Sequence, residues 1–392
     1  MSKPNPATDR AHHLIEQAFA LSCEEGLGAL TARMLGQRAG ASASAVNYHF
    51  GSRERLLAEV HGEARRRAEA ERAALRDQFA VELPPWCSYP NRLTAMVLGR
   101  LGQDRAMAVL LQEFEPEAAG SDDINLRDSV RAELAAERQF WREIAHEHGQ
   151  GPEAAALWAD LVLGLTASLH WEWRIGLLSM WIAAPVGRLY RRLERSKVTL
   201  SEIDAPAIAL REGISTSETA ARILEATIAT IASRGVDRTT QREVAGAAKV
   251  GLASVTHFFP TRDELISAAF AELYRRHGEE QATPDDNEDR AYTMLAYGDP
   301  ASRRGSLAAG ALLTAAARKP ELVPIAEQLR LVRGIGTKHM LQQRGFAVDQ
   351  TDGYIWACVM MGRIRRDRYA MPSPNPSEYA SSARSLSELI FR

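Results

Sequence analysis

Apolar residues recur at helical spacing along most of the chain, whereas the alternating pattern of a β-strand is scarce. Leu14, Ala18 and Leu21, for example, form one apolar stripe with i, i+4, i+7 spacing. Such a stripe is typical of an amphipathic helix with one buried face. Gly26 follows it, and a glycine there favours the left-handed conformation that ends a helix. The pattern therefore predicts an all-α protein.

The stretch that contains this helix is repeated later in the chain. Residues 14–57 align without a gap with residues 223–266, at an offset of 209 (235 − 26 for the two helix-ending glycines). Because an internal repeat indicates domain count and architecture together, we expect two copies of one helical module. The identical pairs include Glu16/Glu225, Thr31/Thr240, Arg33/Arg242, Ala39/Ala248, Val46/Val255, Phe50/Phe259 and Arg53/Arg262.

Each copy is predicted to contain three short helices. Thr31 and Thr240 stand where a second helix would begin, and Thr240 with Glu243 forms a T-x-x-E capping box. A tight turn follows at residues 39–42 and at residues 248–251, and a short third helix comes after each turn. A glycine-bearing turn between the second and third helices is typical of a helix-turn-helix.

Longer helical stretches follow each module. Residues 157–181 are almost continuously apolar, which predicts one helix buried on more than one side. Residues 307–317 and 355–361 have the same character in the second half. Residues 196–216 lose the periodicity and are expected to form a connector, and residues 283–290 are expected to form a smaller acidic loop.

Composition excludes several classes of protein. The 392 residues suffice for about two or three domains, and 45% apolar residues support real cores. The formal net charge is −2, so any contact with nucleic acid must come from local basic faces. The three cysteines are far apart, which argues against a disulfide framework or a zinc site and fits a reducing compartment.

Neither a membrane segment nor a signature of catalysis is found in the sequence. The longest apolar run, residues 175–186, is too short for a bilayer, which needs about 20 residues. No P-loop, dinucleotide glycine pattern, nucleophile elbow or paired metal-ligand spacing is present. We therefore expect a cytoplasmic protein that is not an enzyme, binds no cofactor or metal and contacts no membrane.

Both copies resemble the N-terminal DNA-binding domain of the TetR family of bacterial transcriptional regulators. The similarity is strongest from Thr31-x-Arg33 to Arg53-Glu54-x-Leu56, and from Thr240-x-Arg242 to Arg262-Asp263-x-Leu265. The resemblance implies two TetR-like units in tandem. We therefore expect two helix-turn-helix domains (8–60 and 217–272), two helical ligand-binding and dimerisation domains (61–195 and 273–392) and the connector (196–216).

The resemblance also places candidate residues at DNA. Small residues at the start of the third helix let its backbone lie deep in the major groove. Arg53 stands at the start of a fourth helix, where its charge would suit a phosphate. The expected contacts are Thr31, Arg33, Ser42, Ser44, Ala45, Asn47, Tyr48, His49 and Arg53 in the first copy, and Thr240, Arg242, Gly251, Ser254, Thr256, His257 and Arg262 in the second.

The two copies are unequal. Lys249 replaces the glycine of the turn, which costs about 1 kcal/mol if the position is left-handed. Asn47 and Thr256 both stand where a tyrosine is common in the family. Four basic residues against one acidic give +3 over residues 29–57, whereas four against three give +1 over residues 238–266. We expect the first copy to bind DNA more strongly.

These features predict a ligand-responsive regulator that binds double-stranded operator DNA at the nucleoid, a repressor released by a small hydrophobic or aromatic effector. The alternative is a sensor or interaction protein in which one or both modules no longer bind DNA. Candidate ligand residues crowd the helical bodies, although a core role is the favoured interpretation of their aromatic members. They are Trp141, Trp158, His170, Trp171, Arg174, Tyr354 and Trp356.

Because one chain already carries two recognition helices, it does not need a second chain to contact both half-sites of an operator. Relatives of this type dimerise, so we expect the two halves to pair as an intramolecular pseudo-dimer. The pairing should bring residues 157–181 against residues 354–366, and a homodimer of the whole chain is the alternative. Because the third helices differ in sequence, the operator should have unequal half-sites.

Overall fold

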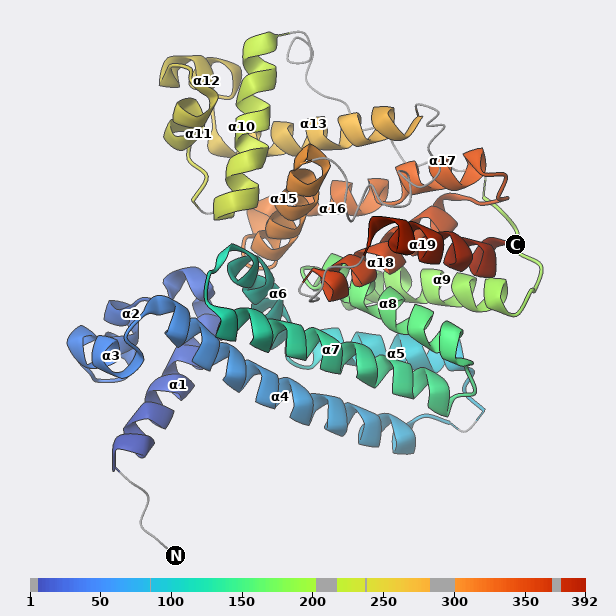
Figure 1. The fold of residues 1–392 in the computed structure, drawn as a ribbon, viewed down its shortest axis with the longest axis horizontal. Helices are drawn as coiled ribbons and strands as arrows, with labels where there is room; N and C mark the ends of the chain where they lie inside the picture. The colour runs from blue at the N-terminus through green and yellow to red at the C-terminus, as the bar shows by residue number, and fades with distance from the viewer. Residues whose placement is uncertain (1–5, 85, 202–216, 237, 283–299, 369–374) are drawn as a thin grey trace, which may run out of the picture. The chain divides into compact units, whose positions relative to one another are not determined.

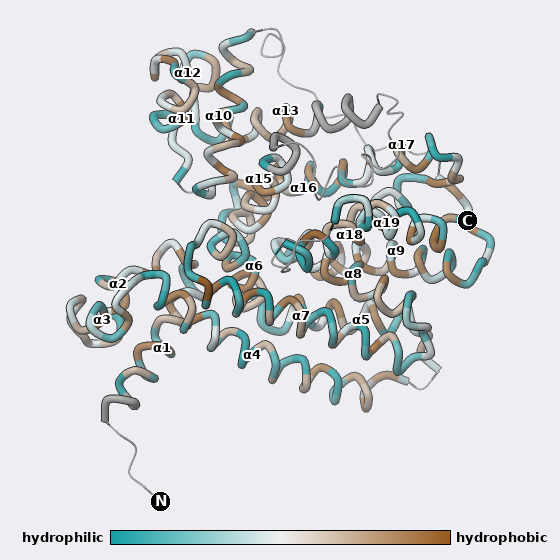
Figure 2. Tube along the Cα trace, viewed as in Figure 1, coloured by the Kyte–Doolittle hydropathy of each residue, from teal (hydrophilic) through white to brown (hydrophobic). Residues whose placement is uncertain are grey.

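The computed structural model describes residues 6–84, 86–201, 217–236, 238–282, 300–368 and 375–392 (Figure 1). Within these ranges every regular element is a helix, which confirms the predicted all-α class. Hydrophilic and hydrophobic residues alternate along α4 and α7 (Figure 2), as expected of helices with one buried face. The acidic loop predicted at residues 283–290 lies outside the described residues, as does most of the predicted connector.

The chain divides into two compact units, and the first contains residues 1–88 and 95–140. Its amphipathic first helix buries Leu14, Ala18 and Leu21 and is followed by Gly26 with φ 87°, as the sequence predicts. The helices that begin in this unit are α1 (Pro6–Glu25), η1 (Leu27–Ala29), α2 (Ala32–Arg38), α3 (Ala43–Phe50), α4 (Arg53–Glu82), α6 (Arg105–Gly120) and α7 (Ile124–Glu147).

The second unit contains residues 89–94 and 141–392, so it combines the end of the first half with the whole second half. Helix α5 (Tyr89–Gly102) contributes residues to both units. The remaining helices are α8 (Pro152–Leu169), α9 (Ile175–Leu193), α10 (Glu218–Arg234), α11 (Gln241–Ala248), α12 (Leu252–Phe258), α13 (Arg262–Ala282), α15 (Pro300–Ala316), η2 (Pro320–Leu322), α16 (Val323–Val332), α17 (Ile335–Gln343), α18 (Gln350–Asp367) and α19 (Pro376–Phe391).

The single helix predicted for residues 157–181 is wrong, because the structure breaks it between α8 and α9. The side chain of Glu172 is fully buried in this break and accepts hydrogen bonds from the Arg174 main-chain N–H (3.0 Å) and Nε (2.8 Å). A carboxylate that binds the N–H two residues later stabilises a turn in place of a helix. Apolar composition alone did not indicate this polar turn.

Helices α8 and α18 pack along each other within the second unit, and α9 packs on α18. A Cβ atom added to Gly164 would lie 1.9 Å from the Cys358 carbonyl oxygen, and one added to Gly362 would lie 1.9 Å from that of Asp160. The two contacts are equivalent: the two glycines are 198 residues apart in the chain (362 − 164), and so are the two residues whose carbonyl groups they face (358 − 160). Such reciprocal contacts are typical of a two-fold interface.

Candidate nucleic-acid interface

The second helix of each module begins at a capping threonine. The Thr31 hydroxyl accepts a hydrogen bond from the Met34 N–H (3.2 Å) at the start of α2. In the second copy Thr240 and Glu243 form the predicted capping box, in which each side chain accepts from the other's N–H at 3.2 Å. Both threonines are exposed, as are Arg33 and Arg242 two residues later. The predicted helix starts are confirmed.

The third helix of the first module, α3, is held by a cap and two buried anchors. Ser42 caps it by accepting a hydrogen bond from the Ala45 N–H (3.1 Å). Val46 and Phe50, four residues apart, are buried on its inner face. The predicted DNA contacts therefore lie on the outer face, where Ser42, Ser44, Asn47 and Tyr48 are exposed and Ala45 and His49 are half-buried.

In the second module α12 has the same anchors but a different outer face. Val255 and Phe259 are buried at the positions equivalent to Val46 and Phe50. Gly251 is the N-cap and offers no side-chain hydrogen bond. On the outer face Gly251, Leu252, Thr256 and His257 are exposed, and Ser254 is half-buried.

The turn before α12 is strained at Lys249. This residue has φ 54° and ψ 47°, the left-handed conformation that its counterpart Gly40 also adopts, with φ 62°. The Arg222 guanidinium donates hydrogen bonds to the carbonyl oxygens of Ala248 (2.6 Å) and Lys249 (3.2 Å). These contacts hold the turn in a conformation that a side chain disfavours by about 1 kcal/mol.

Arg53 and Arg262, expected at DNA phosphates, both have partners inside the protein. Arg53 donates to Glu117 Oε2 (3.1 Å) on α6 and to the Leu27 carbonyl oxygen (3.4 Å). Arg262 donates to the carbonyl oxygens of Thr239 (2.9 Å) and Val236. Each arginine thus joins the start of the fourth helix to the loop after the first. The sequence analysis missed this role, and the phosphate role stays a prediction.

The two modules make different polar contacts with the helical bodies that follow them. In the first copy α6 supplies two carboxylates one turn apart, since Glu113 accepts the Leu27 N–H (2.9 Å) and Glu117 accepts Arg53. In the second copy α15 packs on α10 and carries no acidic residue. In the second copy the carboxylate belongs to the module instead, since Glu225 on α10 accepts a hydrogen bond from Arg304 on α15 (3.1 Å). The spacing of Glu113 and Glu117 was the available sequence signal.

Pairing within the protein also changes the charge comparison of the two modules. Arg38 forms a two-pronged ion pair with Glu24 (2.6 and 2.7 Å), and Arg53 pairs with Glu117. In the part of the chain that the structure describes, Arg33 and Arg55 are the basic residues of the first module for which no partner is found; those of the second are Arg238, Arg242 and Lys249. The first copy thus has no surplus of basic residues without a described partner, and its stronger binding to DNA stays a prediction.

The candidate ligand residues lie in the second unit, and most are core residues. Trp141, Trp158, Trp171, Tyr354 and Trp356 are each 4% exposed or less, and His170 is also buried. Two indole N–H groups are satisfied locally, by Gln150 for Trp158 (3.0 Å) and by the Ser168 carbonyl for Trp171 (2.8 Å). Arg174 is held by Glu172 and Glu327. A ligand role for these residues stays a prediction.

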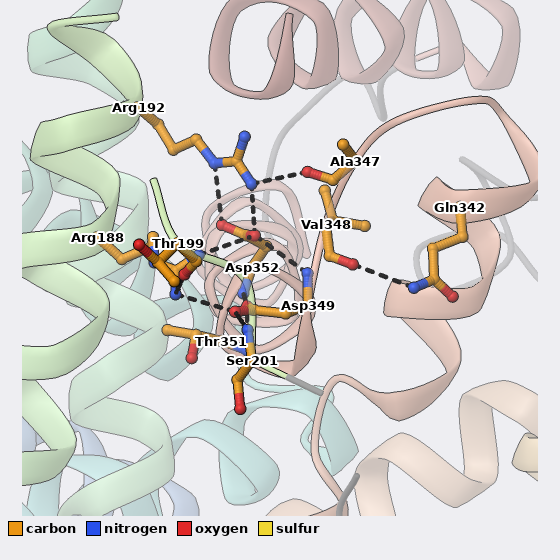
Figure 3. A network of polar contacts seen from close by, with 10 residues as sticks. All are labelled: Arg188, Arg192, Thr199, Ser201, Gln342, Ala347, Val348, Asp349, Thr351 and Asp352. Atoms are coloured by element: carbon orange, nitrogen blue, oxygen red, sulfur yellow. Dashed lines mark hydrogen bonds and ion pairs between the residues drawn. The ribbon is translucent and has the colours of Figure 1, made fainter. Parts of the chain in front are cut away.

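Buried ion pairs connect the two halves of the chain within the second unit (Figure 3). Arg188 on α9 donates to Asp349 (2.9 Å) and Asp352 (3.3 Å) at the start of α18, and Arg192 donates to Asp352 (2.6 Å). The Ser201 N–H also binds Asp349 (2.9 Å). Burial opposes the ionisation of Asp349, but two main-chain N–H groups and the Arg188 guanidinium lower its pKa below the usual value.

A second ionic contact between the halves surrounds Glu172. Arg330 on α16 donates to its carboxylate (2.6 Å), and the same guanidinium lies 4.9 Å from the centre of the Trp171 ring and 4.8 Å from that of Trp181. Burial opposes ionisation, but hydrogen bonds from Arg174 and Arg330 lower the pKa of Glu172 to about 2. The carboxylate is therefore charged at neutral pH.

Comparison with known proteins agrees with the two modules. The family model for bacterial regulatory proteins of the tetR family matches residues 14–60 and again residues 223–269. The chain contains two TetR-type helix-turn-helix modules in tandem. Both matches contain the complete helix-turn-helix and the start of the following helix. The helical bodies that follow the modules lie outside the matched residues.

Other comparisons add little to the family assignment. A crystal structure from Rhodococcus sp., assigned to the TetR family of transcriptional regulators, is 20% identical, with a TM-score of 0.34 over 46% of this chain and 97% of that one. Curated protein sequences give no significant match. Among the described residues, no helix is long and apolar enough to cross a membrane, and no group of three or more His, Cys, Asp or Glu side chains is arranged to hold a metal ion.

Proposed function

We propose that this protein is a ligand-responsive transcriptional regulator of the TetR type, which binds an operator with both of its helix-turn-helix modules. The main support is the pair of modules, each with a threonine cap on its second helix, buried anchors on one face of the third helix and exposed residues on the other. A helix presented in this way can enter the major groove of DNA. A protein with this partner acts at the nucleoid and requires no catalytic centre.

In this proposal the two halves form an intramolecular pseudo-dimer. The reciprocal contacts of Gly164 and Gly362 support it, because a two-fold interface brings equivalent residues together. In the sequence, Leu386 and Ala370 stand 198 residues after Arg188 and Glu172, so their ion pairs join one half specifically to the other. A tandem chain can then bind both half-sites as a monomer. The competing arrangement is a homodimer with four modules.

The regulatory step we propose is release from DNA by a small hydrophobic or aromatic effector. Two recognition helices must lie about 34–36 Å apart to enter successive major grooves. An effector that binds more tightly to another spacing weakens DNA binding by its differential affinity for the two states. The aromatic residues of the helical bodies are the proposed source of its contacts.

Footprinting of the full chain on genomic DNA, combined with its mass in solution, tests these statements. We expect a protected site with two unequal half-sites, bound by one chain. Substituting Arg33 and Tyr48 by alanine should remove protection of one half-site, and substituting Arg242 and His257 that of the other. Arg65→Ala, on the exposed face of α4, is the matched control. If neither double variant alters DNA affinity, the chain is a sensor or interaction protein instead.

A further inference from the structure

The outer faces of the two third helices differ at two equivalent positions that lie one turn apart. Ala43 of α3 corresponds to Leu252 of α12, and Asn47 corresponds to Thr256, at the repeat offset of 209 (252 − 43 and 256 − 47). Within each helix the two positions are one turn apart, so their side chains are neighbours on the surface. The first helix offers a methyl group and an amide there, and the second an isobutyl group and a threonine.

On α3 the amide of Asn47 is available to a partner. The residue is exposed, and the structure gives its side chain no hydrogen bond within the described part of the protein. Its neighbours Ala43 and Ser44 are small and exposed, so they let the helix approach a groove closely. An asparagine amide can bind the edge of adenine with two hydrogen bonds, because its NH₂ group donates to N7 and its oxygen accepts from the N6 amino group.

On α12 the polar group of Thr256 is already used by its own helix. Its hydroxyl donates to the carbonyl oxygens of Leu252 (3.2 Å) and Ala253 (3.1 Å). With its proton held by the helix, this exposed side chain presents its methyl group and the lone pairs of its oxygen to a partner, but no hydrogen-bond donor. Leu252, one turn earlier, is 41% exposed. Together they form an apolar surface at the position where α3 has its amide, and apolar groups in the major groove contact the methyl group of thymine.

We infer that the two half-sites of the operator are recognised by different chemistry: Asn47 reads an adenine in one, whereas Leu252 and Thr256 read thymine methyl groups in the other. The inference rests on the proposed DNA-binding function and adds to it the base class that each module recognises. Since both modules belong to one chain, the operator has a direction. Replacing one half-site by a copy of the other therefore removes the bases that one of the modules recognises.

The test begins with selection of a bound sequence from random DNA by the full chain. Footprints with the Arg33/Tyr48 and Arg242/His257 variants then assign each half-site to a module. In the second half-site, thymine is replaced by uracil, which lacks only the 5-methyl group. We expect affinity to fall about fourfold for each contacted methyl removed. In the first half-site, adenine is replaced by 7-deazaadenine, and we expect a loss of about tenfold.

Matched variants assign these effects to residues. Thr256→Ser keeps the hydroxyl and removes the methyl group, and with Leu252→Ala it should abolish the sensitivity to uracil while leaving that to 7-deazaadenine unchanged. Asn47→Ala should do the reverse. Equal uracil sensitivity in both half-sites, a second half-site without thymine, or unchanged sensitivity in these variants would overturn the inference while DNA binding itself stands. Failure to select any sequence would overturn the proposed function and the inference with it.

Discussion

Gly164 on α8 faces the carbonyl oxygen of Cys358, and Gly362 at the equivalent position on α18 faces that of Asp160. A tandem duplication that kept a homodimer interface would retain this reciprocity, because a two-fold contact maps residue i onto residue j and residue j onto residue i. The close approach needs glycine at both positions, since any Cβ would overlap main-chain atoms.

Gly164→Ala and Gly362→Ala should each destabilise the protein by at least about 2 kcal/mol. The added Cβ would lie 1.9 Å from a main-chain oxygen, so two buried helices must separate to accommodate it. Urea-induced unfolding of the full chain measures the effect. Gly310→Ala is the control: no atom lies within 4 Å of the added Cβ, and alanine favours a helix by roughly 0.5–1 kcal/mol. Unaltered stability of both interface variants would contradict the close helix contact.

Lys249→Gly should stabilise the second module by about 1 kcal/mol. Glycine adopts the left-handed conformation of this turn without the clash that a side chain causes. The reciprocal change Gly40→Ala should destabilise the first module by a similar amount, because Gly40 has φ 62°. Hydrogen exchange of α11 and of α2 can report the two modules separately. The same sign of change in both variants would disprove the equivalence of the two turns.

Arg53 is expected to act mainly by holding the first module against α6. Its ion pair with Glu117 is about one-third exposed, so the net contribution should stay below about 1 kcal/mol. A double-mutant cycle with Arg53→Gln and Glu117→Gln should reveal this coupling in thermal unfolding. If Arg53 contacts a DNA phosphate instead, Arg53→Gln should reduce the slope of log affinity against log salt concentration by about one. Glu117→Gln should leave that slope unchanged.

The modules were predictable from sequence because their signals are local. A glycine after the first helix, a threonine before the second and an apolar pair in the third each act within a few residues, and the repeat presents them twice. The break between α8 and α9 was not predictable in this way. It depends on Glu172, whose partner Arg330 is supplied by the other half of the chain. The partners of Arg53 escaped notice for the same reason, since Glu117 lies on α6.

The buried carboxylate of Glu172 should make stability depend on pH. Its pKa is about 2 in the folded protein and 4.5 ordinarily, so the folded state stabilises the ionised form. This contribution is fully present above about pH 5 and is lost as pH falls towards 2, with a size on the order of 3 kcal/mol. Glu172→Gln should flatten that part of the stability–pH curve, as measured by urea unfolding at pH 3 and pH 6.

Exposed acids supply the control for this pH dependence. Glu153→Gln removes an exposed carboxylate from the first turn of α8 and is the matched control variant. Because Glu172 binds Arg330 of the other half, its protonation should also weaken the connection between the halves. Limited proteolysis at pH 3 should then cleave the native chain faster than at pH 6, and Arg330→Met should make cleavage fast at both values. Equal rates for native protein and variant would show that Glu172 does not join the halves.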